Sequence, residues 1–139
     1  MPSESAIRHN FLKAKAASMM SDFPTHKLGA VMMMGNKVLT VGYNVTKTHP
    51  IQKQYNIERG YDPNVRNNGQ IHAEMMCLIN TRYLNIDWSK VSIYIYREHK
   101  NHKVALAKPC PACLKALKER GITQIYYTTE GFPYDKINF

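Results

Sequence analysis

Three consecutive segments in the second half of the chain constrain the fold most. A β-rich run at residues 91–96 precedes a helix predicted over residues 111–120, and a second β-rich run covers residues 122–128. Pro111 suits the first position of a helix, and Gly121 suits the residue just past its end. A strand, a helix and a strand in this order predict a right-handed crossover between two parallel strands.

The first half of the chain predicts elements that complete one sheet. Apolar residues at helical spacing predict a helix over residues 5–20, and a second over residues 71–83. Two apolar runs flank Gly35-Asn36, which is a hairpin signal. Residues 44–70 are polar and contain Pro50 and Pro63, so we expect a long loop with room for a short helix near residues 50–56. The sum is an α/β fold, with five strands in a mixed sheet covered by helices.

Length and composition exclude several classes of protein. The chain has 139 residues, so we expect a single domain over residues 1–139. Apolar residues make up 44% and charged residues 21%, which excludes a disordered or collagen-like chain. No run reaches the roughly 18 apolar residues of a membrane span, and residues 1–10 lack the apolar core of a secretory signal.

Charge and cysteine content indicate the partner and the compartment. The formal net charge of +9 favours a polyanionic or phosphorylated partner, either a nucleotide or a nucleic acid. Because no apolar run is long enough for a membrane span, we expect no membrane partner. There are three cysteines, and two form the pair Cys110-x-x-Cys113. This odd number favours metal or redox chemistry in a reducing compartment over a disulfide framework, so we expect a cytoplasmic protein.

The residues that carry chemistry are His72-Ala73-Glu74 and Pro109-Cys110-Pro111-Ala112-Cys113, each at the start of a predicted helix. Two thiolates and one imidazole are a good ligand set for Zn²⁺, and three protein ligands leave the fourth position that a catalytic zinc needs for water. Two residues past the histidine, a carboxylate in the first helical turn is able to take a proton from that water and return it to a substrate nitrogen.

Each motif alone has plainer explanations. A lone Cys-x-x-Cys is typical of redox sites or structural zinc, and a lone His-x-Glu is usually a surface feature. A thioredoxin-like site is disfavoured because that motif should follow the first strand, whereas here it follows the third. Together and in this order, His-x-Glu and Pro-Cys-x-x-Cys form the signature of the zinc deaminases.

From about Lys27 to Thr128 the chain resembles the cytidine and deoxycytidylate deaminase superfamily. Leu28-Gly29-Ala30-Val31 is similar to the first strand of that family, and Gly42-Tyr43-Asn44 to the end of its second. The resemblance implies a three-layer α/β/α sandwich around a five-stranded sheet. It also implies a site with Glu74 as the proton shuttle, Asn44 and the Ala73 backbone as substrate contacts, and three ligands to Zn²⁺: His72, Cys110 and Cys113.

The resemblance also bears on the substrate. In one branch of the family, the free-nucleoside cytidine deaminases, strands 4 and 5 are antiparallel. In the other, which includes deoxycytidylate and polynucleotide deaminases, they are parallel. The helix at residues 111–120 followed directly by a strand predicts the second branch with strands 4 and 5 parallel, and Gly42-Tyr43-Asn44 resembles deoxycytidylate deaminases most. Homo-oligomers are usual in such enzymes, so we expect one here.

Further residues are candidates for substrate contacts. Tyr126 and Tyr127 alternate on a strand, so only one faces a given side. We predict Tyr127 as substrate-binding by stacking on the base, with packing of both rings as the alternative. The basic residues of the segment 97–108 are candidates for binding phosphate, or else belong to a solvated loop. Candidates of the same kind lie in the long loop: Lys47, Lys53, Arg59 and Arg66.

Three functions follow from these residues. The first is zinc-dependent hydrolytic deamination of a cytosine nucleotide, dCMP to dUMP with release of ammonia. The second keeps the chemistry but acts on cytosine or adenine in single-stranded nucleic acid or tRNA. The third is a non-catalytic zinc-stabilised binding module, which Glu74 disfavours because a structural site needs no carboxylate beside its ligands.

Overall fold

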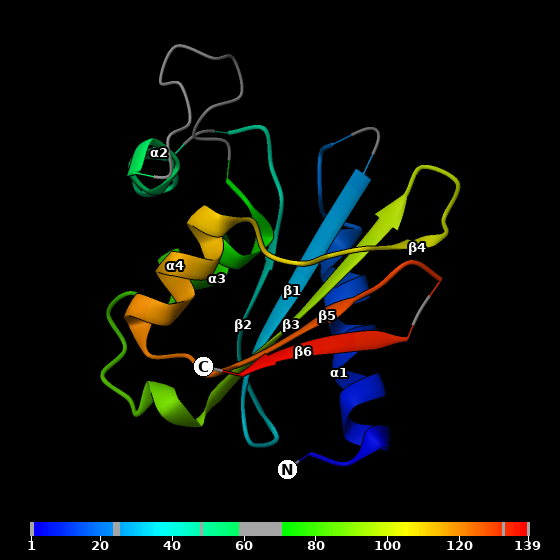
Figure 1. Ribbon diagram of the computed structural model, residues 1–139, viewed down its shortest axis with the longest axis horizontal. Coiled ribbons are helices and arrows are strands. Elements are labelled where there is room, and N and C mark those ends of the chain that lie inside the picture. The colour runs from blue at the N-terminus through cyan, green and yellow to red at the C-terminus, as the bar shows by residue number, and fades with distance from the viewer. Residues whose placement is uncertain (1, 24–25, 48, 59–70, 132, 139) are drawn as a thin grey trace.

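Six strands form one sheet in the computed structural model, which describes residues 2–23, 26–47, 49–58, 71–131 and 133–138 (Figure 1). The strands are β1 (His26–Met34), β2 (Lys37–Tyr43), β3 (Val91–His99), β4 (Val104–Ala105), β5 (Gln124–Thr128) and β6 (Tyr134–Asn138). They are ordered β2-β1-β3-β5-β6, with β4 paired to β3. The helices are α1 (Glu4–Ser18), α2 (Pro50–Glu58), α3 (Ala73–Asn80), α4 (Pro111–Arg120) and the short 3-10 helix η1 (Trp88–Lys90).

The two connections with clear local signals fold as predicted. Strands β1 and β2 form an antiparallel hairpin around Gly35, whose φ of +60° suits glycine. Strands β3 and β5 are parallel, with Ile93 paired to Ile125, and α4 crosses between them. Helix α4 ends at Gly121 in the left-handed conformation, with φ of +103°. The helix–strand crossover is therefore confirmed.

The number of strands and the pairing of the last two differ from the prediction. The described residues form six strands rather than the five predicted. The two-residue β4 and the polar β6 carry no strand pattern, so the sequence does not mark their positions. The parallel pair is β3 with β5, whereas β5 and β6 are antiparallel. Strand β5 ends at Thr128 and β6 begins at Tyr134. Five intervening residues are too few for a parallel crossover, which needs about a dozen or more.

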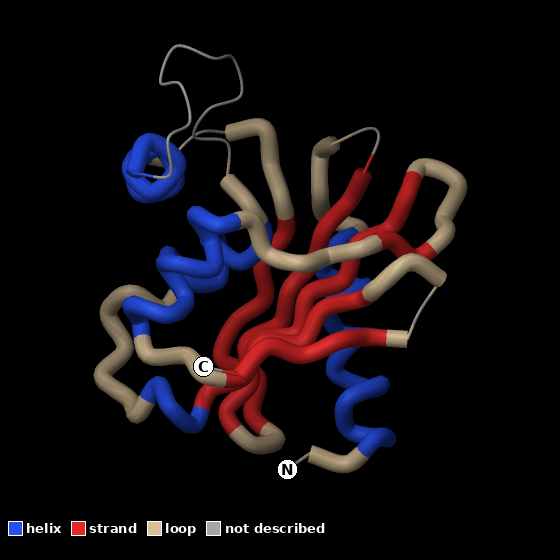
Figure 2. The backbone as a smooth tube through the Cα atoms, viewed as in Figure 1, coloured by secondary structure: helices blue, strands red, loops and turns tan. Residues whose placement is uncertain are grey.

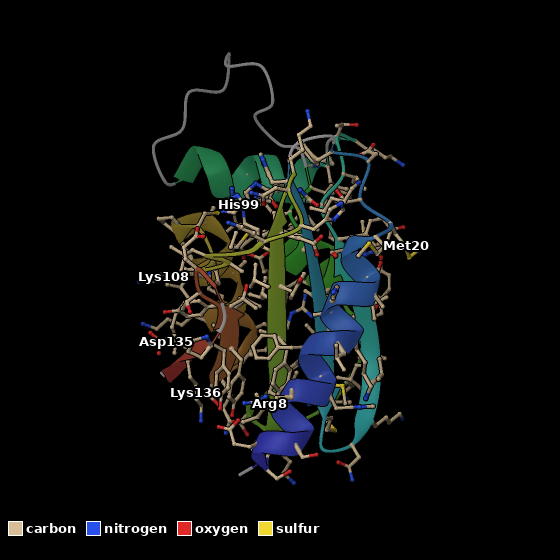
Figure 3. All side chains as sticks on the ribbon, turned by 90° about the vertical axis from the view of Figure 1, so that its right-hand side faces the viewer. Arg8, Met20, His99, Lys108, Asp135 and Lys136 are labelled. Atoms are coloured by element: carbon tan, nitrogen blue, oxygen red, sulfur yellow. The ribbon has the colours of Figure 1, made fainter. Side chains whose placement is uncertain are left out.

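Helices cover both faces of the sheet, as predicted for a three-layer α/β/α fold (Figures 1 and 2). Helix α1 buries Phe11 against one face, where its ring meets the Tyr94 ring edge-on with centroids 5.5 Å apart. Tyr94 stacks on Tyr126 of β5 at 4.5 Å. The turned view shows α1 in front of the strands (Figure 3). Helices α3 and α4 cover the opposite face, in a core that includes Ile93, Ile95, Ile125, Met75 and Leu117.

The predicted helices are present, with somewhat different ends. Helix α1 was expected over residues 5–20 and α3 over residues 71–83, and both are shorter than predicted at their C-terminal ends. The short helix near residues 50–56 exists as α2, which packs against α4. Within the described part of the chain, no helix has the length and apolar character needed to cross a bilayer.

Candidate active site

The N-termini of α3 and α4 bring three metal-binding side chains together. His72 caps α3 and Cys110 caps α4, but neither side chain accepts a hydrogen bond from its own helix. Both side chains instead meet between the helices, with Cys113 from the first turn of α4. The His72 Nδ1 atom lies 3.5 Å from the Cys110 sulfur and 3.3 Å from the Cys113 sulfur.

The donor set fits Zn²⁺. The three ligand atoms all lie within 4.8 Å of one another. A tetrahedral zinc with Zn–N of about 2.0 Å and Zn–S of about 2.3 Å separates its nitrogen and sulfur ligands by about 3.5 Å, which matches the distances here. Two sulfurs and one imidazole complete three of four positions, so the fourth is left for water or substrate. His72, Cys110 and Cys113 are the residues that would hold the ion.

The two cysteines differ in their ionisation. The Cys113 thiol donates a hydrogen bond to the Cys110 sulfur, and together with the nearby His72 this lowers the pKa of Cys110 to about 4, against the effect of burial. The same hydrogen bond and complete burial raise the pKa of Cys113. Cys110 is therefore the more readily ionised of the two ligands, and a Zn²⁺ ion held here would require Cys113 to lose its proton as well.

Glu74 lies beside these ligands, almost completely buried. Its side chain is 3% exposed, and Oε1 has no hydrogen-bond partner among the described residues. Burial raises the pKa of its carboxyl group, while the neighbouring His72 opposes that rise. A buried carboxyl oxygen normally has a partner. An unpaired oxygen beside three metal ligands fits a water or substrate atom held at the fourth position of a zinc ion.

A cleft of about 420 Å³ opens onto this group. Its walls come from the end of β2, the starts of α3 and α4, the segment before β1, the start of β1 and the end of β3. The lining residues are Phe23, His26, Leu28, Asn44, His72, Ala73, Glu74, Arg97, Lys108 and Cys110. The volume suits a small-molecule ligand.

The family model named "Cytidine and deoxycytidylate deaminase zinc-binding region" matches residues 3–129 of the chain. The chain belongs to this deaminase family. The match spans most of the chain and includes both metal-binding motifs. The family and the donor set together support Zn²⁺ as the metal of this deaminase.

Solved structures of other deaminases share the fold. The apo dCMP deaminase of the cyanophage S-TIM5 has a TM-score of 0.63 and 19% identity, covering 93% of this chain and 86% of that one. The same phage enzyme in complex with dCMP and dUMP has a TM-score of 0.54 and 18% identity, covering 91% and 80%. A cytidine deaminase from Burkholderia pseudomallei has a TM-score of 0.62 and 17% identity, covering 94% and 91%. Curated protein sequences include no match to this chain.

Two predicted substrate contacts line the cleft of this deaminase. Ala73 is fully buried in the first turn of α3, where backbone N–H groups have no acceptor within the helix. Asn44 is 5% exposed and binds the backbone of β1: its Oδ1 accepts from the Leu28 N–H at 2.9 Å, and its Nδ2 donates to the His26 carbonyl at 3.3 Å. These bonds fix the orientation of the Asn44 amide at the cleft wall. Both roles as substrate contacts stay predictions.

Tyr127 does not reach the cleft. Its ring belongs to the core between the sheet and helices α3 and α4, and its hydroxyl donates to Asp135 of β6 at 3.3 Å. The geometry therefore gives no support to the predicted stacking of Tyr127 on a base. It supports the alternative, in which the Tyr127 ring packs in the core. Among the basic candidates of the long loop, Arg59, Arg66 and the side chain of Lys53 lie outside what the structure describes, and Lys47 is exposed and is not among the residues that line the cleft.

Gln52 of α2 supports the metal-binding group and was not predicted. Its side chain is fully buried, and Oε1 accepts a hydrogen bond from the His72 N–H at 3.2 Å. The Gln52 amide also lies 4.0 Å from the Cys113 sulfur. Gln52 thus touches both helix starts that carry the ligands. It lies within the polar segment 44–70, where no periodicity marks one residue as buried.

Proposed function

We propose that residues 1–139 form a single zinc-dependent deaminase domain that converts dCMP to dUMP and releases ammonia. The observation that carries this proposal is the Glu74 carboxyl group, which is buried in the cleft beside His72, Cys110 and Cys113 with one oxygen unpaired. A structural zinc site has no use for such a group. The family match and the cleft support a small-molecule substrate.

In the proposed reaction, the metal ligands hold the ion and Glu74 transfers the protons. Zn²⁺, when bound, activates water at neutral pH. Glu74 accepts a proton from that water and delivers it to N3 of the cytosine ring as the water oxygen adds to C4. A second proton, taken from the same oxygen, goes to the exocyclic amine as the C4–N4 bond breaks. The products are a C4 carbonyl and ammonia, so one water is consumed and the protons balance.

The choice of a nucleotide substrate rests on the charge of the cleft wall and not on the topology of the sheet. The antiparallel β5–β6 pair is the arrangement that the resemblance assigns to free-nucleoside enzymes, so strand order supports neither a deoxycytidylate nor a polynucleotide substrate. Arg97 and Lys108 add positive charge to the cleft wall, which favours a phosphorylated substrate. Deamination in single-stranded nucleic acid or tRNA is the second candidate, supported by the net charge of +9. The cytoplasmic location and the homo-oligomer stay predictions.

The test is ammonia release from a panel of cytosine, deoxycytidine, dCMP and a single-stranded oligonucleotide, with zinc content measured on the same samples. We expect turnover of dCMP, and a loss of about 10²- to 10⁴-fold in Glu74→Gln with zinc retained. Glu119→Gln on the exposed side of α4 is the matched control and should keep full activity. Near-normal turnover by Glu74→Gln would refute the mechanism. Bound zinc without deamination of any compound in the panel would refute the proposed deaminase function. Activity on the oligonucleotide alone would refute dCMP as the substrate.

A further inference from the structure

Arg97 lies at the end of β3 that opens onto the cleft. Side chains alternate along a strand, and Ile93 and Ile95 point into the core under α3 and α4. Arg97 continues this row and lines the cleft. The opposite row of β3, with Tyr94 and Tyr96, belongs to the core under α1. The strand pattern therefore directs the Arg97 side chain to the face that carries the metal ligands.

The guanidinium group of Arg97 is only partly used by the protein. One terminal nitrogen donates to the Leu106 carbonyl at 3.3 Å. The Nε atom is buried and has no hydrogen-bond partner among the described residues. Buried donors are normally paired, and an arginine presents a fork of donors that matches two oxygens of a phosphate. The unpaired part of this fork indicates an acceptor that comes from a ligand.

Other charges at the cleft wall have the sign that an anion requires. Lys108 lines the cleft and is exposed. His26, the first residue of β1, also lines it, but burial and the nearby Arg97 lower the pKa of its imidazole, so it adds little positive charge at neutral pH. Glu130, whose charge interacts with Arg97, is held by His99 and by the Leu106 N–H. Within the described residues that line the cleft, Glu74 is the single acidic side chain, and it lies beside the metal ligands. The lysine and arginine side chains of the remaining wall, Lys108 and Arg97, are both cationic.

We propose that Arg97, assisted by Lys108, binds the phosphate of the substrate and makes the enzyme select a nucleotide over its nucleoside. This inference rests on the proposed function, because it assigns the phosphate contact of the same cleft. The base then lies at the end of the cleft with Glu74, and the phosphate lies at the end of β3. Arg97 is a specificity residue and takes no part in moving protons.

The experiment compares dCMP with deoxycytidine for the wild type and for Arg97→Gln. We expect Arg97→Gln to lower kcat/KM for dCMP by about tenfold to a hundredfold, mainly through KM, and to change that for deoxycytidine by less than about twofold. Lys108→Gln should have a smaller effect of the same kind, because this side chain is exposed. Arg82→Gln is the matched control: Arg82 also donates to a backbone carbonyl, that of Ile79, and lies outside the cleft.

Binding gives a readout that does not depend on turnover. In the Glu74→Gln background, calorimetry should show that Arg97→Gln weakens dCMP binding by the same factor as kcat/KM and leaves deoxycytidine binding unchanged. Arg97→Lys should recover part of the dCMP affinity, because it keeps the charge but loses the fork. Equal losses for dCMP and deoxycytidine would make Arg97 a structural residue and overturn the inference. Absence of wild-type activity on every cytosine substrate would instead refute the proposed function.

Discussion

At Gly42, strand β2 packs directly against the backbone of α3. A methyl group added there would overlap the Ala73 carbonyl and would lie 2.9 Å from the Cys77 sulfur and 3.1 Å from the Cys77 nitrogen. Two of these three atoms belong to the backbone of α3 and are unable to rotate away. Gly42→Ala should therefore push β2 and α3 apart at the residue that follows His72.

The expected loss of stability comes from overpacking. Inserting a methyl group into a well-packed region costs about 1–3 kcal/mol and more where backbone atoms are in the way. Replacing glycine also restricts the unfolded chain, which returns about 0.4–1 kcal/mol. A net loss of about 2 kcal/mol corresponds to a fall in Tm of roughly 8 °C for a domain of this size. Displacement of the Ala73 peptide also shifts His72, so zinc affinity should fall.

The assay combines thermal unfolding with a competitive zinc titration. Gly35→Ala is the matched control, because Gly35 has open space around it but a φ of +60°. That variant should lose about 1–2 kcal/mol through backbone strain and should bind zinc as the wild type does. Wild-type melting and zinc binding by Gly42→Ala would refute the packing argument. An equal loss of zinc affinity in Gly35→Ala would show that any loss of stability weakens the site.

Three further predictions concern the surroundings of the site. Gln52→Ala should weaken zinc binding by about 10- to 100-fold in a competitive titration, because the residue orients both helix starts. A chelator at pH 7 should lower Tm by about 10 °C, and Zn²⁺ but not Mg²⁺ should restore it, since a ligand present at about 1,000 times its Kd stabilises by about 4 kcal/mol. Hydrogen bonds from the Thr46 hydroxyl and N–H lower the pKa of Asp22 below its ordinary value of 3.8. These bonds stabilise the fold at neutral pH and are lost as the pH falls through that lowered pKa; an NMR titration should show the midpoint rising in Thr46→Val.

The elements that the sequence predicted well are those with local signals. The turn at Gly35-Asn36 requires a residue with positive φ, and the helix between Pro111 and Gly121 has a proline and a glycine at its ends. The metal ligands were predictable for a related reason. Residues at helix starts converge when their helices pack side by side on one face of a sheet. His72 and Cys110 each stand directly before a predicted helix, so both lie at such a start.

What the sequence did not predict depends on contacts between distant segments. Strand β6 has no apolar alternation and is a strand because β5 offers it an edge. Its antiparallel direction follows from the short connection between β5 and β6. The helix at residues 111–120 precedes β5, so it does not determine the direction of the strand that follows β5. Gln52 is buried because α2 packs across two helix starts, and no property of a lone glutamine in a polar segment indicates this. Tyr127 has an aromatic ring of the kind that stacks on a base, but the register of its strand turns the side chain toward Asp135.

The connection from β3 to α4 joins the sheet to the chemistry. Its short strand β4 pairs with the end of β3, opposite Arg97 and Glu98, and the carbonyl of the next residue, Leu106, accepts from the Arg97 guanidinium. The same connection then delivers Lys108 to the cleft and Cys110 to the metal-binding group. The cation at the cleft wall and the thiolate at its floor are thus held by one stretch of backbone anchored to β3. A change in this connection would alter both the proposed preference for a phosphorylated substrate and the arrangement of the metal ligands. Arg97→Gln leaves the backbone pairing in place, so it should affect the substrate preference alone.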